Sequence, residues 1–152
     1  MKNILAACLL AGLIVITGCN GPGVPKPPSP AELEKEGFYA PHLPRITAEE
    51  LKVMYDNKEP MTLVDVRVRS SYLDGYIPGA RNIPNDPYED SMSALAGLPK
   101  DKPIIIYCDC LDDGDSAVAA ERLASIGGFN NVKVMWKGYY YWKNDLGGET
   151  RQ

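Results

Sequence analysis

Residues 104–117 read IIIYCDCLDDGDSA: an apolar run, a polar loop with two cysteines, and the start of a helix. A continuous apolar run of this kind is typical of a central parallel strand that is buried on both faces. In open α/β folds, ligands bind in the loops that follow the carboxyl ends of such strands. The stretch therefore predicts an α/β fold with a candidate site around Cys108 and Cys110.

Segments with helical and strand periodicity alternate on both sides of this stretch. Thr47 followed by Glu50 matches a capping box, which predicts a helix over 48–57. Strands separated by helices of this size predict a three-layer open α/β sandwich, with a mostly parallel central sheet and helices on both faces. We expect further helices over 70–74, 88–98, 116–126 and 139–144, and strands over 61–66, 80–83, 104–108 and 132–135.

The composition is that of one globular domain. The chain has 152 residues, of which 45% are hydrophobic and 24% charged, and this allows a single core. Sixteen Lys and Arg against 20 Asp and Glu give a net charge of −4. We therefore expect no nucleic acid partner.

The N-terminus has the pattern of a bacterial lipoprotein signal. Lys2 precedes an apolar stretch over 4–16, which is too short for the about 20 residues of a membrane-spanning helix. The stretch ends in Ile16-Thr17-Gly18-Cys19, which resembles a lipoprotein processing site. We expect 1–18 to be a signal peptide and Cys19 to carry the lipid, which places the protein outside the cytoplasm at the cell membrane or the outer membrane. An ordinary secretory signal is the alternative.

Residues 19–45 hold seven of the chain's 13 prolines. Proline-rich segments favour extended polyproline II conformations, so we expect a tether between Cys19 and a domain over 46–147. Phe38, Tyr39 and Leu43 are apolar side chains that could dock back onto this domain.

Cys108 and Cys110 are the thiols that remain once Cys8 leaves with the signal and Cys19 is acylated. The amides of a tight loop and a helix N-terminus form an anion-binding nest that stabilises a thiolate without a cationic side chain. A buried unreactive cysteine and a C-x-C disulfide are the alternatives. We expect no metal site, because His42 is the one histidine and lies far along the chain.

Five motifs resemble those of the rhodanese-like family of single-domain sulfurtransferases, and the resemblance covers about residues 46–144. Its most specific part is GYIPGARNIP at 75–84, in which Tyr76 replaces the family's customary histidine. The resemblance implies a cysteine that accepts a sulfane sulfur from a donor, holds it as a persulfide and passes it to a thiol or cyanide acceptor, with no cofactor. The other motifs lie at 46–51, 63–67 and 101–108, and at Gly138 with Trp142.

The family motifs on the two sides of the loop point to different cysteines as the nucleophile. Counted from the strand, Cys108 takes the family position; counted back from the helix, Cys110 lies the usual six residues before Ser116. The segment from Asp101 to Cys108 matches the family motif without a gap, which favours Cys108 as the nucleophile. Cys110 remains the alternative.

The loop is acidic, and Asp115 stands where the family usually has a basic residue. Either the aspartates are solvated, with Asp115 capping the helix at Ser116, or they act as a filter on substrates. A dianionic donor is disfavoured in both cases relative to a neutral or peptide-borne persulfide. Asp65 and Arg67 are expected to form a structural ion pair from which Arg67 could reach the site. The candidate residues are the catalytic Cys108 and Cys110 and, for substrate binding, Asp109, Leu111, Asp112, Asp113, Gly114, Asp115, Ser116 and Arg67.

Three functions follow from these features. The first is a lipid-anchored extracytoplasmic sulfurtransferase, whose partners are a sulfur donor, a thiol acceptor and the membrane. The second is a redox or sulfur-relay module in which the two thiols alternate with a disulfide. The third is a catalytically idle fold that binds partners.

Overall fold

The structure, a computed structural model, describes residues 23–152. The expected signal peptide and Cys19 lie outside the described residues. Within the described part, no helix is both long enough and apolar enough to cross a membrane.

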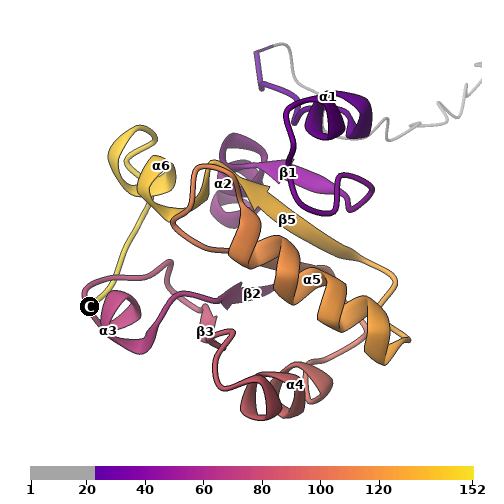
Figure 1. The fold of residues 1–152 in the computed structure, drawn as a ribbon. Coiled ribbons are helices and arrows are strands. Elements are labelled where there is room, and N and C mark those ends of the chain that lie inside the picture. The colour runs from indigo at the N-terminus through magenta and orange to yellow at the C-terminus, as the bar shows by residue number, and fades with distance from the viewer. Residues whose placement is uncertain (1–22) are drawn as a thin grey trace, which may run out of the picture.

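The centre of the fold is a five-stranded sheet in which every paired neighbour is parallel (Figure 1). The apolar run at 104–107 forms its middle strand, and all four residues are buried, as the sequence predicts. In sheet order, the strands are β1 (Arg45–Thr47), β5 (Val132–Trp136), β4 (Ile104–Tyr107), β2 (Thr62–Asp65) and β3 (Arg81–Asn82).

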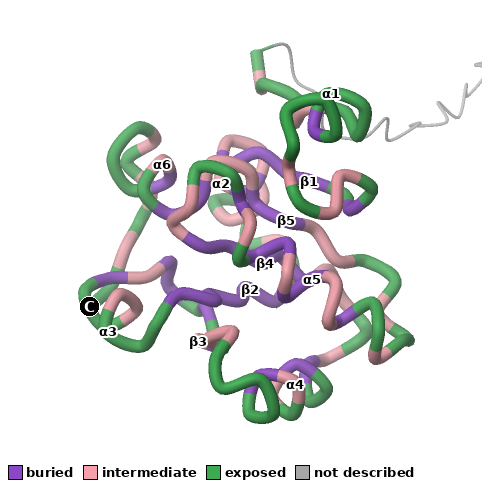
Figure 2. Tube along the Cα trace, viewed as in Figure 1, coloured by how far each residue is buried: buried purple, intermediate pink, exposed green. Residues whose placement is uncertain are grey.

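Helices cover both faces of the sheet, so the three-layer sandwich is confirmed. Successive strand residues point to opposite faces, and Ile104 and Ile106 accordingly pack with α4 and α5, whereas Ile105 and Tyr107 pack with α2 and α6. Figure 2 shows β2 and β4 as the buried centre of the molecule. The helices are α1 (Pro30–Lys35), α2 (Ala48–Asp56), α3 (Arg69–Leu73), α4 (Tyr88–Ala96), α5 (Gly114–Ile126) and α6 (Gly138–Asn144).

The structure corrects the expectation of an extended tether over 30–35, where the short helix α1 forms. Ser29 accepts a hydrogen bond from the amide of Glu32 and the Glu32 side chain returns one to Ser29, which is a capping box, and Pro30 occupies the first helical position. Leu33 is buried, and so is Leu43, whereas Tyr39 is exposed. The folded part of the chain therefore begins well before residue 46.

Two further boundaries differ from the prediction in ways that affect the site. Residues 45–47 form β1, a strand missed because it has only three residues. Helix α5 begins at Gly114 and not at Ser116, so the loop after β4 ends two residues earlier than expected. Both differences change the surroundings of the cysteines.

Candidate active site

The two cysteines lie in the loop that joins β4 to α5, and their exposure differs. Cys108 directly follows β4 and its exposed fraction is 0%. Cys110, two residues further on, is partly exposed. A reagent in solution therefore reaches Cys110 first.

The Cys108 thiol faces the first turn of α5. Its Sγ lies 3.5 Å from the hydroxyl of Ser116 and 4.0 Å from the carbonyl oxygen of Cys110. Burial raises the pKa of the Cys108 thiol, while hydrogen bonds from the side chain and backbone of Ser116 and from Cys110 act in the opposite direction. The pKa stays above its ordinary value, so Cys108 is held as a neutral thiol at neutral pH.

The Cys110 thiol donates a hydrogen bond of 3.5 Å to the carboxylate of Asp115. Burial, the neighbouring Cys108 thiol and Asp115 together raise the pKa of Cys110 to about 12. Asp115 is exposed and its side chain forms no cap on α5, so its expected capping role is wrong. Its carboxylate instead accepts the bond from Cys110.

Asp113 fixes the backbone between Cys110 and α5. It adopts a left-handed conformation with φ 50° and ψ 13° at the N-cap of the helix. Its amide donates to the carbonyl of Cys110 at 3.4 Å, and its own carbonyl accepts bonds from the Ser116 hydroxyl at 2.8 Å and the Ala117 amide at 2.9 Å. Asp113 thus connects both cysteine positions to the start of α5.

The Asp113 carboxylate is buried, which corrects the expectation of a solvated loop aspartate. It receives two hydrogen bonds from Arg45, from Nε at 3.2 Å and from Nη2 at 3.0 Å. Burial raises the pKa of Asp113 and Arg45 opposes that rise. Asp112 is exposed and Asp109 partly exposed, so these two, with Asp115, make up the acidic surface of the loop.

The close packing of α6 against the cysteine loop requires glycine at position 138. The amide of Tyr139 donates to the carbonyl of Cys108 at 2.7 Å, which holds the end of β4 against the start of α6. A Cβ atom at Gly138 would lie 2.6 Å from that carbonyl oxygen, and Gly138 also has a φ of +61°. The sequence resemblance singled out this glycine, and its role is the close approach to Cys108.

Arg67 forms the expected structural ion pair with Asp65, whose carboxylate is fully buried. Arg67 Nε lies 3.0 Å from Oδ1 and Nη2 lies 2.6 Å from Oδ2 of Asp65. Nη2 also donates to the carbonyl of Gly75, and the guanidinium lies 3.9 Å from the centre of the Tyr139 ring. These contacts tie the end of β2 to the loop before β3 and to α6.

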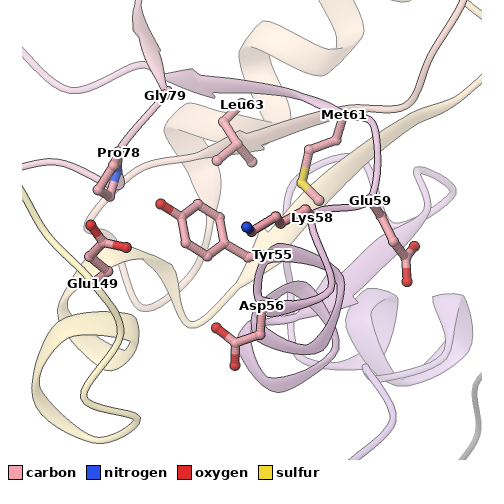
Figure 3. A pocket seen from close by; sticks show the side chains of 9 residues that line it. All are labelled: Tyr55, Asp56, Lys58, Glu59, Met61, Leu63, Pro78, Gly79 and Glu149. Carbon is pink, nitrogen blue, oxygen red and sulfur yellow. The ribbon is translucent and has the colours of Figure 1, made fainter.

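The remaining predicted site residues lie around the two thiols. Leu111 is 80% exposed at the tip of the loop, and Gly114 opens α5. A pocket of about 460 Å³ lies elsewhere, between the end of α2 and the segment at Pro78 and Gly79, with the Tyr55 ring and Glu149 at its wall (Figure 3). Among residues 23–152, no group of three potential metal ligands clusters.

The molecule is an α/β protein with a cysteine loop at the carboxyl end of the middle strand of its parallel sheet, which is where ligands bind in open α/β folds. Residues 47–145 match the rhodanese-like domain, and the chain belongs to that family. The solved rhodanese-like domain of an Anabaena protein is 35% identical, with a TM-score of 0.61 over 71% of this chain and 78% of that domain.

Some of the curated relatives that match the chain carry sulfurtransferase names, and another is named as an HTH-type transcriptional regulator, of Mycobacterium tuberculosis, 46% identical over 32% of this chain. The chain is 29% identical to the thiosulfate sulfurtransferase GlpE of Pseudomonas entomophila, over 62% of this chain and 81% of that protein. It is 30% identical to the adenylyltransferase and sulfurtransferase UBA4 of Candida albicans, over 67% of this chain. The chain spans only 24% of UBA4, so the match concerns one domain of that protein.

Sequence reasoning missed Arg45, which the structure brings to the cysteine loop. No local pattern marks an arginine at the start of a three-residue strand, and its partner lies 68 positions further along the chain. Asp113 gave no signal of the pair either, because its positive φ and its burial are visible only in the structure.

Proposed function

We propose that this protein is a sulfurtransferase that carries a sulfane sulfur as a persulfide on Cys110. The observation that carries the proposal is the partly exposed Cys110 thiol in the loop after β4, since the Cys108 thiol in the same loop is fully buried. Membership of the rhodanese-like family supports the reaction class. Because Cys110 is more exposed than Cys108, the structure supports Cys110 as the residue that takes up the sulfur, although the sequence alone favoured Cys108.

The transfer needs no external oxidant or reductant. The Cys110 sulfur attacks the terminal sulfur of a donor persulfide R–S–SH, the donor S–S bond breaks, and the donor leaves as the thiol R–SH. Cys110 gives up its thiol proton to solvent before the attack, and the leaving thiolate takes a proton from solvent. Cys110 then holds the sulfur as Cys110–S–SH until a thiol or cyanide acceptor takes it.

The charge of the loop favours neutral or peptide-borne persulfides as donors. Asp109, Asp112 and Asp115 remain at the loop surface, and a dianion such as thiosulfate approaches them against like charge. Arg45 neutralises Asp113 only, from the buried side.

The test is the mass of the protein after incubation with sulfane donors. We expect a gain of one sulfur, about 32 Da, that cyanide removes, faster from a neutral persulfide than from thiosulfate at equal concentration. The rate should rise with pH between 7 and 10, because the reacting form is the thiolate and the Cys110 pKa of about 12 lies above this range. Absence of the adduct with every donor would contradict the proposal.

We also propose that the protein is a lipoprotein anchored outside the cytoplasm through Cys19. The support is the sequence Ile16-Thr17-Gly18-Cys19 at the end of a short apolar stretch. Full-length protein in a bacterial host should incorporate a labelled fatty acid, and the Cys19→Ser variant should not. Equal labelling of both proteins would exclude Cys19 as the anchor.

A further inference from the structure

Arg45 binds the cysteine loop through Asp113. It lies outside the family match, which begins at residue 47. All five of its N–H donors have partners. Nε and one N–H of Nη2 bind the Asp113 carboxylate. The other three donate to the backbone carbonyls of Tyr39, Ala40 and Leu43. With exposed fractions of 1% for the Arg45 side chain and 0% for Asp113, this pair is sealed from solvent.

The Asp113 backbone needs such a restraint. A non-glycine residue with a φ of 50° lies in a sparsely populated region and keeps that conformation only when its surroundings impose it. The Asp113 side chain forms no hydrogen bond with the helix that it precedes. Its bidentate contact with Arg45 is therefore the side-chain interaction that secures this conformation.

The restraint reaches both thiols through the Asp113 backbone. The amide of Asp113 binds the carbonyl of Cys110, and the carbonyl of Asp113 binds the hydroxyl of Ser116. That hydroxyl lies 3.5 Å from Cys108 Sγ. If Asp113 left the left-handed region, Cys110 and Ser116 would both lose the contacts that orient them.

We propose that Arg45 is a positioning residue for sulfur transfer, which sets the conformation of the cysteine loop through the buried carboxylate of Asp113. The segment 39–45, which precedes the matched domain, is then a working part of the site and not a tether. The inference rests on the proposed role of Cys110.

Arg45→Met tests the proposal, with Leu51→Ala as a control that loosens the core on the far face of the sheet. Arg45→Met should slow sulfur uptake by folded protein by about 10- to 100-fold, because the reacting sulfur is misplaced. The pH profile of Cys110 alkylation should also move to lower pH, because a loosened loop exposes the thiol and separates it from Asp115. Leu51→Ala should change neither quantity once the folded fraction is accounted for.

The double variant Arg45→Met, Asp113→Gly provides a rescue. Glycine adopts a φ of 50° freely, and the substitution removes the carboxylate that would otherwise lie buried and unpaired. The double variant should recover most of the uptake rate and the original alkylation profile, even where Arg45→Met alone is too unstable to measure. A folded double variant without recovery, or a folded Arg45→Met with unchanged rate and profile, would overturn the proposal. The alkylation profile reports on the loop even if no donor yields an adduct, so it separates this inference from the proposed function.

Discussion

Cys110→Ser is expected to reduce sulfur uptake by at least about 100-fold, to the background level of the assay. A serine hydroxyl is not ionised at neutral pH and forms no persulfide, so the variant lacks both the nucleophile and the carrier atom. The fold should be preserved, because Cys110 is only partly buried at the edge of the core and a serine hydroxyl can also donate to Asp115. The measurement is the 32 Da adduct, with circular dichroism as the check on folding.

Cys108→Ala is the matched variant, and we expect it to lower stability and to leave sulfur uptake nearly unchanged. Cys108 packs among the core residues between the sheet and α5, so its truncation should lower the free energy of unfolding by about 1–2 kcal/mol. Uptake should stay within about threefold of that of the unsubstituted protein. If Cys108→Ala lost uptake and Cys110→Ser did not, Cys108 would be the nucleophile. Loss in both variants would favour a dithiol and disulfide couple, which needs both sulfurs.

Arg67→Met is expected to lower the free energy of unfolding by about 3–5 kcal/mol. The substitution leaves the fully buried Asp65 carboxylate without its cation and removes the bond to the Gly75 carbonyl and the contact with Tyr139. The uncompensated charge, and not the loss of the ion pair itself, accounts for most of the cost. Urea unfolding followed by circular dichroism measures the change.

Two controls separate the buried charge from general effects of removing an arginine. Arg69→Met removes an exposed arginine two residues away, and it should change the free energy of unfolding by no more than about 0.5 kcal/mol. Asp65→Asn combined with Arg67→Met should recover part of the loss, because no unpaired charge remains. A cost for Arg67→Met no larger than that for Arg69→Met would show that the pair adds nothing to stability.

Periodicity and apolar runs were sufficient to predict most elements of the fold. The middle strand at 104–107 was predicted because a strand covered on both faces must be apolar throughout. Helix α2 was predicted from its capping box, which involves residues only three positions apart. Helix α1 carries the same kind of signal at Ser29 and Glu32, and the density of prolines around it concealed the signal.

Patterns within short segments were enough to predict the alternation of helices and strands from residue 48 onward, the resemblance to the rhodanese-like family and the loop that holds both thiols. Which thiol meets solvent and which loop aspartate is buried became known only from the folded chain. The burial of a residue depends on which other segments pack against it. Helix α5 packs against Cys108, and Arg45, in the edge strand β1, pairs with Asp113. Contacts between residues so distant in the chain leave no local pattern, since each partner is chosen by the folded geometry alone.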